Sequence, residues 1–290
     1  MEPLIVDGVA ITHPDREVFG AGGPTKGDVA AYYDAVAPLM LPELRERPLS
    51  VVRCPRGTQG ACFFQKHHAD TLGKHVRAVK LKEKDGGDAS YLYVDDVEGV
   101  LELVQMNTLE FHPWGAHVDD PDLPDRLIFD IDPAKGVAWK DVVACARTIR
   151  ERLGEGGLES YVRSSGGKGL HVVAPFERGP SWSEVKAFCE AIADGMVAAA
   201  PKRYIAEASK ARREGLIFID WLRNTRGATS VTGWSLRARA GAPVAMPLHW
   251  DEIARLKTGG AFDLEKALKR AKSLDADPWE GIAALKQSLP

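Results

Sequence analysis

The chain has 290 residues, 44% of them hydrophobic and 27% charged, and a formal net charge of −3. This length suits one large domain or two ordinary ones, and the composition is that of a soluble globular protein with a packed core. No apolar run approaches the roughly 18 to 20 residues of a membrane helix, and the first residues lack the basic and apolar segments of a signal peptide. We therefore expect a cytoplasmic protein with no membrane partner and no uniformly positive surface.

The four cysteines form no Cys-x-x-Cys pair and have no histidines at the spacing of a zinc site. Thiols of cytoplasmic proteins stay reduced as a rule. We therefore expect reduced structural thiols, rather than a metal or redox site, at all four positions: Cys54, Cys62, Cys145 and Cys189.

Three elements are expected at the start of the chain: a strand interrupted by a turn, a helix, and a second strand. Thr25 is the expected N-cap of the helix, because its hydroxyl can accept a free amide hydrogen of the first turn. Pro42 and Pro48 are expected to close the helix, since proline has no amide hydrogen to donate. The apolar spacing predicts the ranges 4–11, 26 to about 40, and 49–54.

Two adjacent phenylalanines, Phe63 and Phe64, follow this strand and are close to Lys66. On a strand, one of two neighbouring rings must face away from the core. An exposed ring can stack on a nucleic acid base, and the lysine can contact a phosphate. The alternative is that one ring packs in the core and the other under a loop.

A β-hairpin is predicted for residues 76–94 with 85–88 (DGGD) as its turn, and a helix for 97 to about 109. His112 follows in an extended segment that Pro113 breaks. A lone histidine in such a place is more often a structural side chain than a ligand.

Residues 127–133 (LIFDIDP) form an apolar strand that ends in two carboxylates and a proline. Because strand side chains alternate, Asp130 and Asp132 point to the same side, roughly 6.6 Å apart. Two like charges this close need a partner, and a divalent cation with oxygen ligands is the simplest one. The alternative is a turn in which both carboxylates are solvated.

A glycine-rich turn, residues 164–169 (SSGGKG), joins predicted strands at 160–163 and 170–175. Its glycines allow the backbone to approach an anion, and Ser165 and Lys168 add donors. An ordinary hairpin turn is the alternative. His171 shares a strand face with Val173, opposite the aliphatic face, so we do not expect it in the core.

Residues 201–240 carry nine lysines and arginines against three acids, a basic zone that suits phosphates, with a solvated charged face as the alternative. Asp220 closes an apolar strand at 216–221, the pattern already met at Asp130. Arg237 and Arg239 share one face of an alternating segment. Helices are predicted at 139–153, 181–200, 250–256, 264–273 and 278–289.

Three aspartates at strand ends form a reasonable cage for two Mg²⁺ or Mn²⁺ ions, which take carboxylate oxygens and substrate phosphates. Two such ions can support an in-line displacement at phosphorus. Together with the lysines, arginines and an exposed phenylalanine, this set indicates nucleotidyl transfer. The same carboxylates could direct water at a phosphodiester, so a metal-dependent nuclease is an alternative, as is a non-catalytic module that bridges DNA ends.

Six short motifs occur in one order over roughly residues 4–260: RCPRG…FFQKH, EFHPW, FDIDP, SSGGKGLHV, IDWLRNTRGAT and SLRARAGAPVAMPLHWDE. They resemble the polymerase domain of bacterial ligase D, of the archaeo-eukaryotic primase superfamily. The resemblance implies an α/β (α+β) fold with a mixed, largely antiparallel central sheet, an RRM-like core and flanking helices. It also suggests a single domain, 1–290, with an N-terminal subregion at about 1–110, a catalytic core at about 111–248 and a C-terminal helical tail at about 249–290.

The resemblance assigns roles to individual positions. The two metals would bind Asp130, Asp132 and Asp220. Nucleotide contacts would come from Arg53, Phe64, Lys66, His112, Ser165, Lys168, His171 and Arg237. The 5′-phosphate of a gap or break would contact Arg16 and Lys26. Position 16 is an arginine where we expect a lysine, which keeps the charge but changes its geometry.

The implied reaction is template-dependent addition of nucleotides from NTP or dNTP, with ribonucleotides preferred and Mn²⁺ favoured, at gaps and double-strand breaks in bacterial non-homologous end joining. Implied partners are DNA ends or gapped duplex, a Ku-type end-binding protein and a DNA ligase, at the nucleoid. The chain carries no ligase or nuclease module, which fits either a free-standing member or one domain of a longer protein. Ser165 or His112 could supply the polar group that recognises a ribose 2′-hydroxyl.

Overall fold

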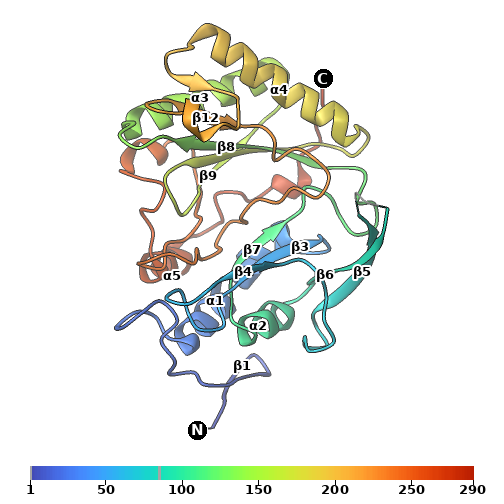
Figure 1. Ribbon diagram of the computed structural model, residues 1–290, viewed down its shortest axis with the longest axis vertical. Helices are drawn as coiled ribbons and strands as arrows, with labels where there is room; N and C mark the ends of the chain where they lie inside the picture. The colour runs from blue at the N-terminus through green and yellow to red at the C-terminus, as the bar shows by residue number, and fades with distance from the viewer. Residues whose placement is uncertain (1, 84–85) are drawn as a thin grey trace.

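The computed structural model describes residues 2–83 and 86–290, and its largest sheet has six strands. This sheet lies in the upper half of Figure 1, with α3 (Trp139–Glu155) and α4 (Trp182–Ala199) above it. Neighbouring strands are antiparallel except for the first two, which are parallel. The strand order is β11 (Tyr204–Ile205), β12 (Ile217–Asp220), β8 (Arg126–Pro133), β10 (Leu170–Pro175), β9 (Tyr161–Ser164) and β13 (Pro247–Leu248).

Strand β8 lies inside the sheet, between β12 and β10, and both of its faces carry apolar side chains. Leu127, Phe129 and Ile131 are fully buried in the main core. Ile128, on the opposite face, packs in a smaller cluster with Val173 and Trp279. Asp130 and Asp132 share the face of Ile128, as the alternation of a strand requires.

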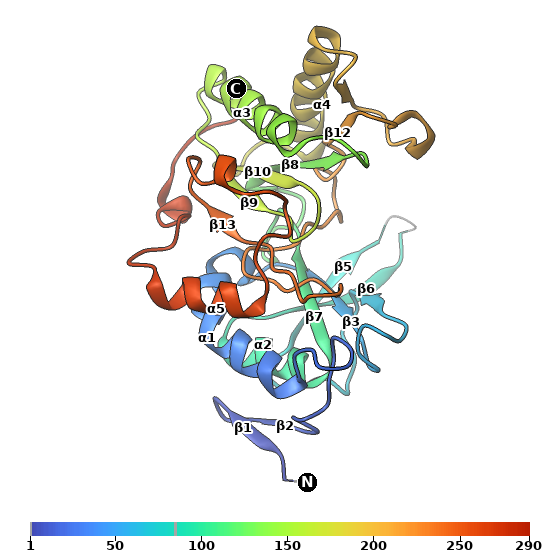
Figure 2. The ribbon, with the colours of Figure 1, turned by 90° about the vertical axis from the view of Figure 1, so that its left-hand side faces the viewer.

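A second sheet lies in the lower half of the molecule, with helices below it (Figures 1 and 2). It has three antiparallel strands in the order β4 (Phe63–Gln65), β3 (Leu49–Arg53) and β7 (Thr108–Pro113). The helices are α1 (Lys26–Leu44) and α2 (Val97–Gln105). Together the two sheets and their helices confirm the expected α/β fold with a mixed, largely antiparallel sheet.

Helix α1 begins as predicted but ends later. Thr25 accepts a hydrogen bond from the backbone N–H of Asp28, which confirms the N-cap. The prediction that Pro42 closes the helix is wrong, since the helix continues to Leu44. The last turn buries Met40 and Leu44, and this burial outweighs the backbone hydrogen bonds that proline cannot make.

Helix α2 is shorter than predicted. It ends at Gln105, and Asn107 takes a left-handed backbone conformation with φ of 65°. The chain then reverses into β7, which pairs with β3. The sequence pattern had assigned Leu109 to the helix because its apolar spacing fits both structures.

Two hairpins complete the lower half. The opening strand is a hairpin of β1 (Leu4–Val6) and β2 (Val9–Ile11), and the hairpin predicted for 76–94 is confirmed as β5 (Arg77–Lys82) and β6 (Asp88–Tyr93). The first residue of its predicted turn, Asp85, lies outside the described residues. Among the described residues, no helix has both the length and the apolarity to cross a membrane.

The C-terminal part is less helical than predicted. Helix α5 (Leu264–Ser273) matches its predicted range. The helices predicted at 250–256 and 278–289 are single 3-10 turns, Ile253–Arg255 and Ile282–Ala284. The segment around 277–282 is fixed by side chains, because Trp279 is buried and its Nε1–H donates to the carbonyl of Val162 at 3.0 Å.

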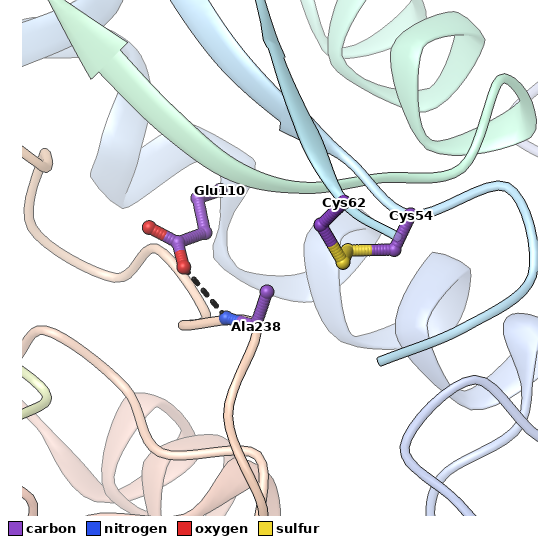
Figure 3. Close-up of a disulfide and its surroundings, with 4 residues drawn as sticks. All are labelled: Cys54, Cys62, Glu110 and Ala238. Carbon is purple, nitrogen blue, oxygen red and sulfur yellow. Dashed lines mark hydrogen bonds between the residues drawn. A yellow bond between two sulfur atoms is a disulfide. The ribbon is translucent and has the colours of Figure 1, made fainter. Parts of the chain in front are cut away.

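The expectation of four reduced thiols is wrong for two of them. Cys54 and Cys62 form a disulfide, with Cα atoms 4.3 Å apart (Figure 3). The two cysteines flank the antiparallel pair Arg53 and Phe63, so the register of β3 and β4 brings them together. This register is not visible in the spacing of the cysteines. Cys145 and Cys189 are free and buried, as expected.

Candidate active site

The pairing of three strands places the candidate metal ligands side by side. Asp220 on β12 lies directly opposite Asp130 on β8, and Asp130 lies opposite His171 on β10. Directly opposed residues of antiparallel strands project from the same face of the sheet. Asp132 projects from that face two residues further along β8. Asp130, Asp132 and Asp220 are called the aspartate cluster below.

Asp130 and Asp220 share one arginine that the sequence reasoning did not identify as a site residue. The Nε of Arg223 lies 3.1 Å from Asp220 Oδ2, and its Nη2 lies 3.6 Å from Asp130 Oδ2. Burial raises the pKa of Asp220, and the negative charge of Asp130 adds to this effect, while Arg223 opposes it. Two partly buried carboxylates with one shared cation are an arrangement that a divalent cation would stabilise.

Asp130 is ionised in spite of its burial. Burial by itself would raise the pKa of this carboxyl, but His171 and the charges of Arg223 and Arg237 outweigh it and lower the pKa to about 2. The Nε2 of His171 lies 3.4 Å from Asp130 Oδ1. Burial lowers the pKa of His171, while the charge of Asp130 and its hydrogen bond act in the opposite direction.

Asp132 lies at the open end of the cluster. Its carboxylate is half-exposed, and Arg213 Nη1 lies 3.3 Å from Asp132 Oδ2. The guanidinium of Arg213 lies over the ring of Phe218, 3.6 Å from its centroid. Phe218 is the residue opposite Asp132 in the sheet, so the ring supports the arginine beside the carboxylate.

A cavity of about 330 Å³ opens beside the aspartate cluster, and most of its lining side chains are charged or polar. The glycine-rich turn forms one wall of this cavity. Within that turn the hydroxyl of Ser165 accepts hydrogen bonds from the backbone N–H groups of Gly167 and Gly169, both at 3.2 Å. The lining side chains include Asp130, Asp132, Ser165, Lys168, His171, Arg223, Arg237 and Arg239.

Arg237 is held in this wall by Glu110 of β7. The Nε of Arg237 lies 2.9 Å from Glu110 Oε2, and its Nη1 donates to the carbonyl of Ser165 at 2.6 Å. The second oxygen of Glu110 accepts the backbone N–H of Ala238 at 2.7 Å (Figure 3). Burial disfavours the charged form of Glu110, but the hydrogen bond from His112 and the charge of Arg237 lower its pKa to about 2. Glu110 was missed by the sequence reasoning, although an acid within a buried strand is an unusual feature.

His112 and Phe64 reach the site from the lower sheet. A smaller cavity of about 150 Å³ is lined by both of them together with Asp130, His171 and Arg223. Phe64 is 66% exposed and Phe63 47%, so the alternative in which one ring is in the core is wrong. The rings of Phe64 and His112 meet edge to face at 5.5 Å. The site therefore lies between the two sheets.

Besides Asp220, four predicted site residues do not line these two cavities. Lys66 lines a neighbouring cavity of about 440 Å³ and pairs there with Glu83 at 2.7 Å. Arg53 donates to the carbonyl of Met106 and to Gln65. The other two, Arg16 and Lys26, lie together at the start of α1.

Arg16 and Lys26, called the basic pair below, are joined by a hydrogen bond from the N–H of Lys26 to the carbonyl of Arg16. Their side chains bond to amide oxygens: Lys26 Nζ to Gln105 Oε1 at 2.7 Å, and Arg16 to Asn107. No carboxylate of the described part of the chain forms an ion pair with either one. Burial and the charge of Arg16 lower the pKa of Lys26 to about 8.

The donor set of the aspartate cluster fits a hard divalent cation, because all three ligands are carboxylates on one face of one sheet. Among the described residues, donor atoms that converge within 4.8 Å belong to a different group, His75, Asp96 and Glu98, at the N-terminus of α2. The aspartate cluster is more open. Arg223 and Arg213 lie against its carboxylates.

The chain resembles known proteins over most of its length. A family model described as LigD, primase-polymerase domain, matches residues 25–279. The multifunctional non-homologous end joining protein LigD of Pseudomonas aeruginosa is 37% identical over 284 residues, which are 97% of this chain and 34% of that protein. The LigD protein of Mycolicibacterium smegmatis is 32% identical over 85% of this chain and 32% of its own length. The chain thus spans about a third of the length of these relatives.

A solved structure agrees with these matches. The polymerase domain from Mycobacterium tuberculosis ligase D, in complex with DNA, superposes with a TM-score of 0.89 at 29% sequence identity. The match covers 95% of this chain and 98% of that one. The chain belongs to the LigD primase-polymerase domain family.

Proposed function

We propose that the chain is a DNA-repair polymerase with primase-like chemistry, a nucleotidyltransferase that extends 3′ ends at gaps and double-strand breaks in bacterial non-homologous end joining. The observation that carries this proposal is the direct opposition of Asp220 and Asp130 beside a cavity with four cationic side chains. The family match and the polymerase and end-joining names of the relatives support it.

The aspartate cluster would hold two Mn²⁺ or Mg²⁺ ions. Such ions, when bound, make the attacking oxygen a better nucleophile and offset the negative charge that develops on the phosphoryl group. The chain's own contribution is to hold three carboxylates on one face of a rigid sheet, with Asp130 ionised across the physiological pH range.

The triphosphate would bind along the glycine-rich turn. Lys168, Arg237 and Arg239 line the cavity and supply positive charge, and Arg237 is fixed in advance by Glu110. Donors fixed before the reaction cost no reorganisation during it. The exposed ring of Phe64 is placed to stack on a base, and Ser165 or His112 would recognise a ribose 2′-hydroxyl, which makes ribonucleotides the preferred substrates.

The basic pair would bind the 5′-phosphate of a gap or a broken end. Two adjacent cations that pair with no carboxylate among residues 2–83 and 86–290 favour an anion, and their charge-assisted hydrogen bonds to phosphate are strong. A Ku-type end-binding protein and a DNA ligase are proposed partners by family. Within a cell, the protein would act on the nucleoid in the cytoplasm.

The test is extension of a labelled gapped duplex with ribonucleotides or deoxyribonucleotides, with and without Mn²⁺. We expect metal-dependent, template-directed addition that is faster with ribonucleotides. Shortening of the labelled strand without added nucleotide would indicate a nuclease. DNA binding with neither reaction would indicate a bridging module.

A further inference from the structure

A buried chain of polar contacts runs from helix α1 to the aspartate cluster through Glu43, Arg163 and His171. Glu43 is 7% exposed, Arg163 1% and His171 3%. Arg163 Nη1 lies 2.7 Å and 2.9 Å from the two carboxylate oxygens of Glu43, and its Nε donates to His171 Nδ1 at 3.2 Å. The opposite ring nitrogen of His171 faces Asp130. The sequence reasoning identified neither Glu43 nor Arg163.

The hydrogen bond between Arg163 and His171 fixes which ring nitrogen of His171 carries the proton. A guanidinium has only donors, so the nitrogen that accepts from Arg163 must present its lone pair. That nitrogen is Nδ1, and in a neutral imidazole the single proton is then on Nε2, which faces the carboxylate of Asp130. The other tautomer would place a donor against Arg163 and a lone pair against a carboxylate. Both contacts would then be repulsive.

Arg163 is held firmly enough to impose this choice. Arg163 and His171 are directly opposite each other on β9 and β10. The ring of Trp279 covers the guanidinium, with its centroid 5.2 Å from the Arg163 carbon. Ser230 Oγ lies 3.2 Å from His171 Nδ1 and 3.3 Å from Arg163 Nη2, which adds a polar neighbour on the same side.

Glu43 makes it possible to bury this cation. Besides Arg163, it accepts hydrogen bonds from the backbone N–H of Gly233 at 2.9 Å and from Arg126 Nη1 at 3.2 Å. The charges of Arg163 and Arg126 and these hydrogen bonds lower the pKa of Glu43 in spite of its burial, which acts in the opposite direction. A buried arginine without such a partner would be strongly destabilising.

We infer that Arg163 is a positioning residue for the active site: it holds His171 as the Nε2–H tautomer, whose N–H faces one oxygen of Asp130 at 3.4 Å and orients that carboxylate toward the other two aspartates of the cluster. Groups that hydrogen-bond a metal-binding carboxylate in this way commonly change metal affinity about 10-fold to 100-fold when removed. The effect on metal binding rests on the proposed function, whereas the tautomer of His171 does not.

The tautomer can be read by NMR of protein labelled with ¹⁵N-histidine, because the two ring nitrogens differ in chemical shift when only one is protonated. The His171 signals are assigned by their absence in His171→Gln. We expect the wild-type protein to show a protonated Nε2 with and without Mg²⁺. A protonated Nδ1, or a cationic ring at pH 7.5, overturns the inference without any variant of Arg163.

Arg163→Gln is the test variant, and Arg126→Gln is its matched control, because it also removes an arginine from Glu43 but does not touch His171. Arg163→Gln should populate the second tautomer and weaken Mn²⁺ binding, measured by electron paramagnetic resonance, about tenfold. Arg126→Gln should leave the tautomer unchanged. If Arg163→Gln does not fold, Arg163→Lys keeps the charge beside Glu43 but removes the planar donor, and the same shift in tautomer is expected.

Two outcomes separate this inference from the proposed function. If wild type and Arg163→Gln show the same His171 tautomer and the same Mn²⁺ affinity, the inference is overturned even when DNA extension proceeds. A wild-type protein with the expected tautomer but no nucleotide addition leaves the positioning role intact and overturns the function.

Discussion

The aspartate cluster and the basic pair balance their charges in opposite ways. In the cluster, each carboxylate has a cation close by, with Arg223 beside Asp130 and Asp220 and Arg213 beside Asp132. In the basic pair, Arg16 and Lys26 contact amide oxygens and each other, and burial beside Arg16 lowers the pKa of Lys26 to about 8. In the aspartate cluster, a metal ion can take the place of an arginine beside a carboxylate. The basic pair, by contrast, is stabilised only when an anion binds. The difference supports the proposal of a metal at the aspartate cluster and a phosphate at the basic pair.

The largest effect is expected from Asp130→Asn, which keeps the shape of the side chain but removes the charge shared by Arg223 and His171. Nucleotide addition with Mn²⁺ should fall on the order of a thousandfold, because loss of a preorganised charge at a reacting phosphoryl group costs a few kcal/mol. Single-turnover extension of a gapped duplex measures it. Asp194→Asn, at an exposed aspartate of α4, is the matched control. A rate within twofold of wild type would remove Asp130 from the metal site.

A second test concerns the disulfide between Cys54, directly after β3, and Cys62, directly before β4. The N–H of Cys54 donates to the carbonyl of Asn107, whose side chain bonds Arg16, and the strand after Cys62 carries Phe64. Cys62→Ser should lower the free energy of unfolding by about 2.5 kcal/mol under oxidising conditions, because the bridge closes a short loop in the unfolded chain. Urea denaturation with and without reductant measures the loss. Equal stability of oxidised wild type and variant would argue against the bridge.

The basic pair can be tested by pH. Lys26 is charged below its pKa of about 8 and becomes neutral above it, so attraction to a 5′-phosphate should fall as pH rises. Affinity for a gapped duplex with a 5′-phosphate, divided by that for a 5′-hydroxyl duplex, should drop about fivefold from pH 7 to 9. Lys26→Arg should flatten this profile, since arginine stays protonated. Parallel profiles in the two proteins would exclude Lys26 from the phosphate site.

The smallest effect is expected from Ser165→Ala. The variant should lower the ratio of ribonucleotide to deoxyribonucleotide addition about threefold, with less effect on deoxyribonucleotides, because only the ribose offers a 2′-hydroxyl partner. The hydroxyl also accepts the N–H groups of Gly167 and Gly169, so a uniform loss with both sugars would assign Ser165 to the turn alone. Ser288→Ala, at an exposed serine, is the control.

Local sequence patterns predicted those parts of the site whose geometry is set within a single strand or helix. Asp130 and Asp132 share a face because of strand alternation, and Thr25 caps α1 because the first turn needs an acceptor. The opposition of Asp220 and Asp130 depends on strand order, which the sequence indicated only through similar strand endings and a resemblance.

Three of the charged residues that sequence reasoning missed, Glu43, Glu110 and Arg163, have partners that are distant in the chain. Glu43 and Arg163 are 120 positions apart, and Glu110 and Arg237 are 127 apart. Read singly, each appears as an ordinary surface charge, and only tertiary packing shows that it is buried and paired. The disulfide was missed for the same reason, since a strand register joins its cysteines.

The buried Trp279 sets a practical limit on how this domain can be shortened. Its ring covers Arg163, its indole N–H bonds β9, and the neighbouring Asp277 accepts from Trp234 at 2.8 Å. A truncated protein that stops after α5 would lose these contacts although it retains every proposed ligand of metal, nucleotide and DNA. Expression of the isolated domain should therefore extend beyond residue 282, and an inactive shorter version says nothing about the chemistry of the site.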